Sequence, residues 1–177
     1  MGLFENIKIR RINKIIKKQD AKALLGLSDD ASVDFLITLT HDYFYEMPLD
    51  ELNNEQRTVF LCMVFDETCQ ADGILSLTED ENVFFSLYET YNALLSIGAA
   101  KTADELKRFI ELMPENTFEE RIMPEWDWFF ADSEREKLIK EIESAASGYL
   151  DGLISDLLWS YCTSDIETAK KVLDINL

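Results

Sequence analysis

Residues 53–73, NNEQRTVFLCMVFDETCQADG, allow the fold class to be predicted most directly. Asn53 followed by Gln56 resembles a helix-start signal, and Gly73 is a residue type that commonly ends a helix. The apolar residues between them are separated by three, four or seven positions, which is the spacing of a helix face. They are Val59, Cys62, Met63, Phe65 and Cys69. We therefore expect a long helix over residues 54–71.

A stronger form of the same start signal, Ser/Thr-x-x-Glu, recurs along the chain. In this pattern the hydroxyl accepts a hydrogen bond from the N3 amide, and the glutamate reaches back to the amide of the cap residue. Each copy precedes a segment with helical apolar spacing, and 6 Gly and 3 Pro allow few turns. The copies are Thr78–Glu81, Thr102–Glu105, Thr117–Glu120, Ser133–Glu136 and Ser164–Glu167.

These signals predict an all-α protein, with one helical domain of about seven to nine helices. Residues 1–22 would form a basic amphipathic N-terminal helix, and residues 23–177 an acidic helical domain. Residues 37–45 alternate enough that a strand is the alternative there, and residues 118–130 indicate a short helix with an ordered loop. In full, the expected helices are 3–18, 20–26, 32–46, 54–71, 79–97, 103–113, the short one within 118–130, 134–162 as one or two helices, and 165–174.

Charge is distributed unevenly along the 177 residues, whose net charge is −18. Residues 1–22 carry seven basic and two acidic side chains, a net charge of +5, whereas the rest carries 10 basic and 33 acidic, a net of −23. The hydrophobic fraction of 47% allows a substantial core, so this is not a disordered acidic tail. Such a body repels nucleic acid and attracts basic proteins, through a field that salt weakens.

The basic N-terminal segment has three possible locations. Its apolar residues Phe4, Ile7, Ile12, Ile15 and Ile16 make it amphipathic. It could dock on the acidic body of its own or a second copy, remain a free solvated helix, or lie on an anionic membrane. Docking on an acidic body is the favoured alternative because the charges are complementary.

The cysteine count and the apolar segments bear on the compartment. The three cysteines are odd in number, and no apolar run approaches the ~20 residues that span a bilayer. Basic residues interrupt the N-terminus, where a signal peptide would be apolar. We therefore expect a cytoplasmic protein with no membrane span, in which the cysteines are small buried hydrophobes.

No catalytic or cofactor-binding pattern appears in the sequence. His41 is the single histidine, so sites built from several histidines are excluded, and no phosphate-binding glycine loop occurs. Residues 68–79, TCQADGILSLTE, place Gly73 and Glu79 where a calcium-binding EF-hand loop has its glycine and last ligand. Thr68 and Gln70 stand where carboxylates are usual, so we expect a connection between helices there. We expect no cofactor, no metal site and no enzyme.

An aromatic block lies at residues 123–130, MPEWDWFF. The simpler interpretation is a loop that fills the core between helices. The functional interpretation is a surface for a protein partner, since Trp and Phe are effective anchors when polar groups surround them. The flanking residues Glu125, Asp127, Asp132, Glu134 and Glu136 would supply an acidic rim.

Several features occur in the order found in a bacterial family of small acidic helical domains named for a DNA-mimic member. A helix start runs from Leu52 to Arg57, a bend contains Gly73, residues 93–99 read ALLSIGA, and a further helix ends at Pro114. The chain resembles this family over roughly residues 40–165. The bend departs from the family's usual Asn-Gly-Gly-Phe. The resemblance implies an all-α fold and a protein–protein role in which carboxylates imitate DNA phosphates.

The function that we predict is a non-enzymatic acidic protein-binding domain that occupies the basic site of a DNA-binding protein, such as a transcription factor. An immunity-type inhibitor of a basic nuclease toxin and a metal-dependent hydrolase using carboxylates are the alternatives. We expect no direct binding to nucleic acid, and homodimerisation is left open. The predicted partner-binding residues are Glu79, Asp80, Glu81, Glu119, Glu120, Trp126, Asp127, Asp132, Glu134 and Glu136.

Overall fold

The computed structural model describes residues 3–148 and 150–175, with side chains from residue 7 onward, and every named secondary-structure element in this part is a helix. The predicted all-α class is confirmed. Eight of the α-helices have seven or more residues, within the expected seven to nine, and three have five residues. They are α1 (Leu3–Lys17), α2 (Ala21–Leu25), α3 (Ser32–Leu39), α4 (Asn54–Ala71), α5 (Glu81–Phe85), α6 (Leu87–Ser96), α7 (Ala100–Glu111), α8 (Trp126–Phe130), α9 (Ser133–Ala146), α10 (Ile154–Cys162) and α11 (Ile166–Val172).

Short helices of other kinds connect these α-helices. Three are 3-10 helices, and the fourth, η2, is a π-helix that continues α3, so the segment for which a strand was the alternative is helical. They are η1 (Asp29–Ala31), η2 (Thr40–Phe44), η3 (Leu49–Glu51) and η4 (Ile74–Thr78).

Two compact units divide the chain. Unit 1 comprises the residues up to Met63 and those from Leu153 onward, and unit 2 comprises Val64–Gly152. The long helix α4 contributes its first part to unit 1 and its last part to unit 2, and its bounds agree with the predicted 54–71.

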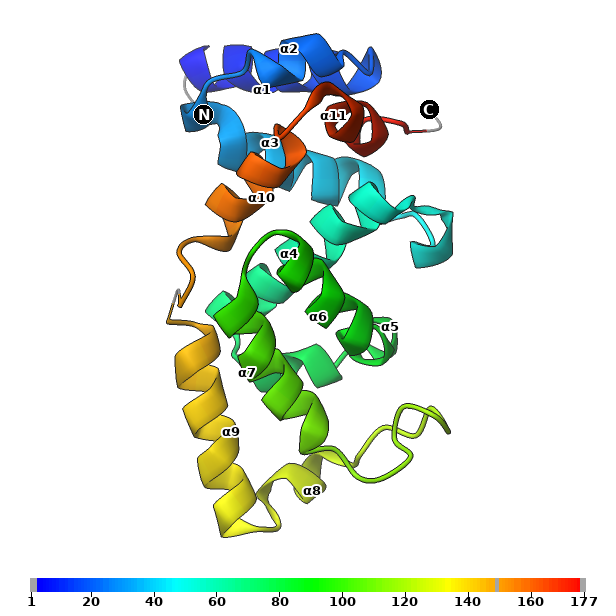
Figure 1. Cartoon of the computed structure of the whole chain (residues 1–177), viewed down its shortest axis with the longest axis vertical. Helices are drawn as coiled ribbons and strands as arrows, with labels where there is room; N and C mark the ends of the chain where they lie inside the picture. The colour runs from blue at the N-terminus through cyan, green and yellow to red at the C-terminus, as the bar shows by residue number, and fades with distance from the viewer. Residues whose placement is uncertain (1–2, 149, 176–177) are drawn as a thin grey trace. The chain divides into compact units, whose positions relative to one another are not determined.

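Unit 1 joins the two ends of the chain. Figure 1 shows α11 (dark red) near α2 (blue), with which it is in contact, and α10 packs on α3. Phe35 of α3 is fully buried and meets Trp159 of α10 edge to face, with ring centroids 5.8 Å apart. The indole N–H of Trp159 donates a hydrogen bond of 3.0 Å to Asp29. These contacts bury the apolar stripes of α3 and α10 against each other, which stabilises both helices.

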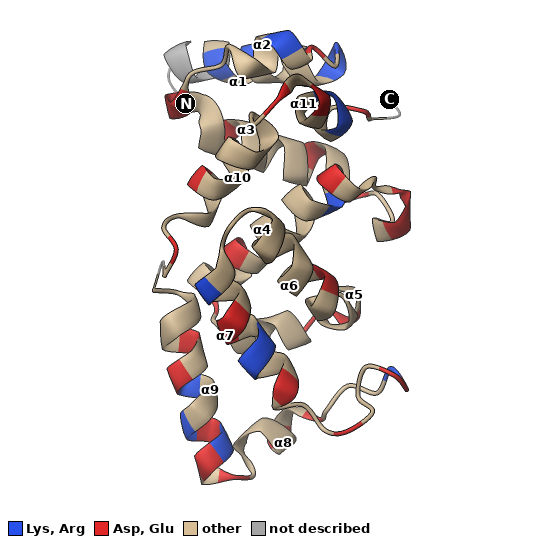
Figure 2. Cartoon of the chain, in the orientation of Figure 1, with Lys and Arg blue, Asp and Glu red and all other residues tan. Residues whose placement is uncertain are grey.

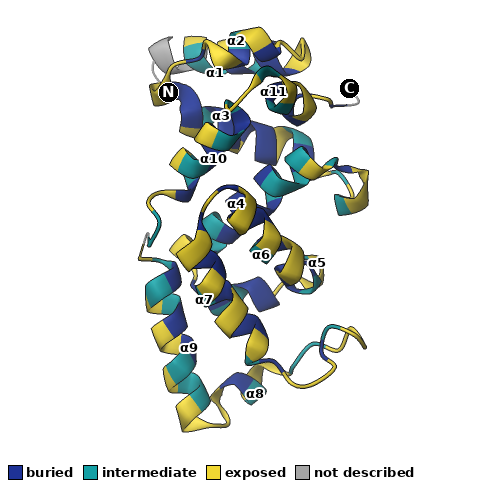
Figure 3. Cartoon of the chain, in the orientation of Figure 1, coloured by how far each residue is buried: buried dark blue, intermediate teal, exposed yellow. Residues whose placement is uncertain are grey.

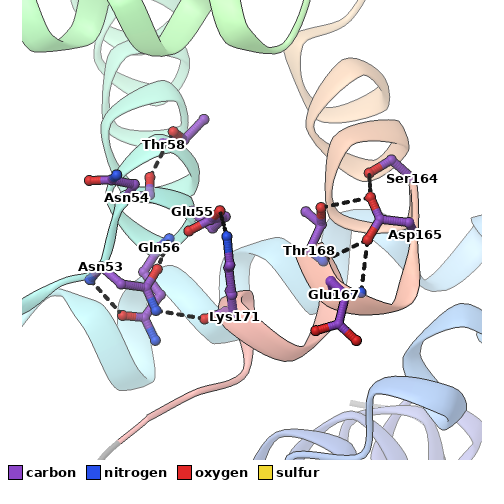
Figure 4. Close-up of polar contacts among 10 residues, drawn as sticks. All are labelled: Asn53, Asn54, Glu55, Gln56, Thr58, Ser164, Asp165, Glu167, Thr168 and Lys171. Atoms are coloured by element: carbon purple, nitrogen blue, oxygen red, sulfur yellow. Dashed lines mark hydrogen bonds and ion pairs between the residues drawn. The ribbon is translucent and has the colours of Figure 1, made fainter.

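The start of α4 is also tied to α11 within unit 1 (Figure 4). Asn53 and Gln56 exchange two hydrogen bonds, each of 3.0 Å, between side chain and backbone amide, as the sequence pattern predicted. The Asn53 amide group also donates to the carbonyl of Lys171 at 2.8 Å, and the Lys171 ammonium pairs with Glu55 at 2.7 Å.

Unit 2 is built around α6, α7 and α9, and Figure 1 shows α7 and α9 side by side, running in opposite directions. Buried and exposed residues alternate around both helices (Figure 3). The buried residues recur at helical spacing, so each helix turns one apolar face inward. On α7 they include Leu106, Phe109 and Ile110, and on α9 Ile139 and Ile142.

The helix starts differ from the predicted Ser/Thr caps. Asp80, Asp132 and Asp165 cap α5, α9 and α11, each accepting two backbone amides, in place of Thr78, Ser133 and Ser164. An ionised carboxylate forms stronger hydrogen bonds with amides than a hydroxyl and also interacts favourably with the helix dipole. The correct helices were therefore predicted with caps one or two residues away from the real ones.

Two other predicted starts were wrong. Thr102 lies inside the first turn of α7, where its amide donates at 2.8 Å to Asp151, a cap supplied from elsewhere in unit 2. Thr117 lies in a turn that does not start a helix, and the short helix expected within residues 118–130 begins only at Trp126, after an ordered loop. The expected single helix 79–97 is also divided, because Ser86 ends α5 and its hydroxyl donates back to the carbonyl of Asn82 at 2.6 Å.

Candidate acidic interface

Most of the negative charge belongs to unit 2. Its residues include 21 acidic and 7 basic side chains, a net charge of −14, whereas unit 1 has a net charge of −4. Figure 2 shows red residues interspersed with blue ones along α7 and α9. All ten predicted partner-binding residues fall in this unit.

The first predicted group stands at the start of α5. Asp80 uses one carboxylate oxygen to accept the amides of Asn82 at 2.8 Å and Val83 at 3.2 Å. Glu79 and Glu81 on either side are exposed, and Glu79 accepts a hydrogen bond from the Ser76 hydroxyl at 3.3 Å. Asp80 therefore has a structural role, whereas its two neighbours present their carboxylates to solvent.

The second group, Glu119 and Glu120, lies in the long connection between α7 and α8. Both side chains are exposed. Between α7 and Glu119, Phe118 stacks on Phe84 of α5, with ring centroids 5.3 Å apart, and meets Tyr88 of α6 at 5.1 Å. These ring contacts bring the loop carboxylates to the α5–α6 side of unit 2.

The connection between α7 and α8 also contains a cation–π contact and a small pocket. The guanidinium of Arg121 lies 4.3 Å from the ring centroid of Phe85 on α5. Asn116 and Arg121 have positive φ angles of 67° and 52°, which tighten the loop where it turns. The loop encloses a pocket of about 120 Å³ lined by residues of 114–124. Pockets for organic ligands are usually about 300 Å³ or more, so this pocket is small for a substrate.

The third group lies where α8 meets α9. Asp132 caps α9 by accepting the amides of Glu134 at 2.9 Å and Arg135 at 3.0 Å. These amide hydrogen bonds, that of Arg135 above all, lower the pKa of Asp132 from its ordinary value. Glu136 pairs with Lys140 at 2.6 Å, whereas Trp126, Asp127 and Glu134 are exposed.

The structure therefore arranges the ten residues in two places within unit 2. One is the α5 start with the Phe118-anchored loop, and the other is the α8–α9 junction. Three aromatic residues next to these places, Tyr88, Phe118 and Phe130, are not among the predicted partner-binding residues. Phe130 belonged to the quoted aromatic block and was detectable, but Tyr88 and Phe118 lie 30 residues apart and only the tertiary contact relates them.

The stretch that resembles an EF-hand loop connects α4 to α5 through η4. Gly73 precedes η4 with a φ of 86° and a ψ of 170°, a backbone conformation reserved almost entirely for glycine. A Cβ at Gly73 would stand 2.4 Å from a carboxylate oxygen of Glu143 on α9, so this glycine also permits a close approach. In the described residues no group of three or more His, Cys, Asp or Glu side chains is arranged to hold a metal ion.

The single histidine and the three cysteines lie outside the predicted partner-binding groups. His41 is exposed and stacks on Tyr45, with ring centroids 6.0 Å apart. Cys62, Cys69 and Cys162 are buried and form no disulfide, in agreement with the prediction that they are small buried hydrophobes. Burial raises the pKa of the Cys162 thiol to about 12 and also raises the pKa of Cys69, where the nearby charges of Asp66 and Glu143 add to the effect.

The N-terminal helix α1 packs within unit 1 and contacts α3 and α2. Ile12, Ile15 and Ile16 are at most 4% exposed, and Lys8 forms an ion pair of 2.5 Å with Asp34. This arrangement corresponds to docking on the chain's own body, although isoleucines make most of the contact. Three of the five predicted apolar residues are therefore buried, whereas Ile7 is 56% exposed and the side chain of Phe4 lies outside the described part of the chain. The basic residues on the opposite face, Arg10, Arg11, Lys14, Lys17 and Lys18, are exposed.

These features define an acidic, all-helical protein in its described part. The chain belongs to the DMP19-like protein family, whose model matches residues 50–165, from η3 to just beyond α10. No curated protein and no solved structure gives a significant match to the chain. None of the helices in the described ranges combines the length and apolarity that crossing a membrane requires.

Proposed function

We propose that this chain is a non-enzymatic acidic domain that binds a basic protein, in the manner of a DNA mimic that occupies the basic site of a DNA-binding protein such as a transcription factor. The observation that carries the proposal is the net charge of −14 on unit 2. A concentrated negative field attracts basic surfaces over a Debye length of about 10 Å at 0.1 M salt and accelerates association with them.

The state of the individual carboxylates supports this proposal. Glu119, Glu120, Asp127 and Glu134 are exposed and have no ion pair with a cation in the described chain. Their charge is therefore available to a partner. Asp80 and Asp132 serve as helix caps, so neutralising them would disturb folding as well as binding. Tests of the surface are best confined to the first four.

The membership of the chain in the DMP19-like family adds support of a general kind. A DNA mimic must compete with the duplex for the same basic site, and such binding weakens steeply as salt is added. The distinguishing measurement is therefore competition between this protein and labelled DNA for a basic protein captured from the native cell. If capture recovers a nuclease that is inhibited on binding, the immunity-type alternative is favoured instead.

Two variants with the same net charge provide the test. The first combines Glu119→Gln, Glu120→Gln, Asp127→Asn and Glu134→Gln in unit 2. The control combines Glu46→Gln, Asp50→Asn, Glu51→Gln and Asp156→Asn, which are exposed residues of unit 1. We expect the unit 2 variant to lose about ten-fold or more in affinity at low salt and the control to lose much less. Equal losses, or an affinity insensitive to salt, would contradict the proposal.

A further inference from the structure

Helix α8 displays two large aromatic side chains to solvent. Trp126 is 49% exposed and Phe130 is 43% exposed, and their ring centroids lie 5.6 Å apart. They are four positions apart in the sequence, so they lie on the same side of the helix. We call this pair the Trp126–Phe130 platform. Exposed aromatic side chains in contact with each other are uncommon on surfaces without a partner, because burying them would be favourable.

The other residues of α8 hold the platform in place. Phe129 is 1% exposed, and its ring lies almost parallel to that of Phe109 on α7, with an interplanar angle of 8° and centroids 6.5 Å apart. Arg135 of α9 places its guanidinium 3.7 Å from the ring centroid of Trp128 and also donates a hydrogen bond to the Trp128 carbonyl. Because α8 is fastened on these sides, the platform is preorganised, which lowers the entropy lost on binding.

The surroundings of the platform are anionic. Glu125, Asp127, Asp132 and Glu134 are exposed in or next to α8. Asp132 remains ionised because the amides of α9 lower its pKa. The neighbouring cation Arg135 already interacts with Trp128. The side chains around two exposed rings therefore favour a cationic occupant over an apolar or anionic one.

We infer that the Trp126–Phe130 platform binds an arginine side chain in a basic segment of the partner protein, an inference that rests on the proposed function and specifies the site. A planar guanidinium stacks on aromatic rings and is more weakly hydrated than an ammonium, so arginine suits such a surface better than lysine. The rim carboxylates would accept its N–H groups. This contact adds a specificity for arginine that an acidic field alone does not provide.

The inference is tested on the full chain with two peptides of equal length and charge. In one peptide arginines are separated by alanines, and in the other lysines replace the arginines. The indole N–H resonances of Trp126, Trp128 and Trp159 report the site in a two-dimensional NMR titration. We expect the arginine peptide to bind about two- to five-fold more tightly, the range of an exposed cation–π contact, and to shift the Trp126 resonance most. Equal affinities of the two peptides would overturn the inference.

The variant Trp126→Ala/Phe130→Ala is expected to lose the preference for arginine while keeping the salt-sensitive binding of both peptides. Its matched control is Val33→Ala/Ile37→Ala, a pair of exposed side chains on α3 that are also four residues apart. A retained arginine preference in the platform variant would overturn the inference and leave the proposed function intact. If the parent protein binds neither peptide, both the inference and the proposed function are contradicted. A platform variant that changes only the oligomeric size in analytical ultracentrifugation would make a second copy the occupant and overturn the inference.

Discussion

Gln56 joins Asn53 in a reciprocal pair of hydrogen bonds and simultaneously holds the end of the chain. Its side-chain oxygen accepts the Asn53 amide at 3.0 Å, and its side-chain nitrogen donates to the carbonyl of Asp174 at 2.8 Å. Gln56 is 2% exposed. One side chain therefore caps α4 and satisfies a carbonyl just after α11, so the stability of two helices depends on it.

Replacing Gln56 with alanine should lower the free energy of unfolding by about 1–3 kcal/mol, because it leaves buried polar groups without partners. Urea denaturation followed by circular dichroism measures the change. Gln70→Ala is the control, since Gln70 is exposed and water can replace the hydrogen bonds of its side chain, which join it to the carbonyl of Ser147 at 3.4 Å and to the side chain of Asp66. If the two variants are equally stable, the link between α4 and α11 contributes little.

Gly73→Ala should destabilise the protein more than Gly98→Ala. Both glycines have a φ of 86°, but an added Cβ would meet Glu143 at Gly73 and nothing within 4 Å at Gly98. The unusual backbone region at Gly73 costs about 1–3 kcal/mol for other residues. Thermal unfolding of the two single variants provides the comparison.

The double variant Gly73→Ala/Glu143→Ala separates the causes of this effect. We expect it to recover only a minor share of the loss, because the colliding carboxylate ends a flexible side chain that can move. Full recovery would show that the contact with Glu143, and not the backbone conformation, makes glycine necessary.

Acid should weaken the contribution of Asp132 to stability. Its pKa in the folded protein lies below the ordinary 3.8 because amides of Arg135 and Glu134 donate to the charged form. The stabilisation is therefore fully present above pH 3.8 and is lost as pH falls through the lowered pKa. Melting temperatures across pH should show a difference between the parent and Asp132→Ala that shrinks in acid.

Ser133→Ala is the control for Asp132, since the sequence pattern predicted Ser133 as the cap of α9 and the structure assigns this role to Asp132. We expect Ser133→Ala to change the melting temperature little at any pH. A loss at neutral pH as large as that of Asp132→Ala would place the cap at Ser133 after all.

The three cysteines should resist thiol reagents in the folded protein. Cys62 and Cys162 are 0% exposed and Cys69 is 5% exposed, and burial raises the pKa of Cys162 and Cys69, which disfavours the reactive thiolate. A chromogenic disulfide at pH 8 should label fewer than one thiol per chain before unfolding and three in denaturant. Fast labelling of one thiol without denaturant would reveal local opening of its helix.

The helices could be predicted from sequence to different degrees. Residues 54–71 were predicted with both bounds correct, because apolar spacing, a start signal and a glycine stop coincide there. The break at Ser86 was not predicted, since Ser86 sits within continuous helical spacing and the break depends on its hydrogen bond to Asn82. In the candidate site, Trp126 and Asp127 were identified from the local aromatic block, whereas the place of Phe118 depends on rings distant in sequence.

The sequence by itself determined the helical fold class, the uneven charge and the DMP19-like family, because periodicity, composition and motif order are properties of neighbouring residues. Only the tertiary structure decided which polar groups meet. It made Asp151 the cap of α7, Gln56 the partner of Asp174, and α8 a helix fastened by Phe129 and Arg135. The physical reason is that each of these contacts satisfies a polar group or buries an apolar surface using residues far apart in the chain, and local pattern carries no information about such pairings.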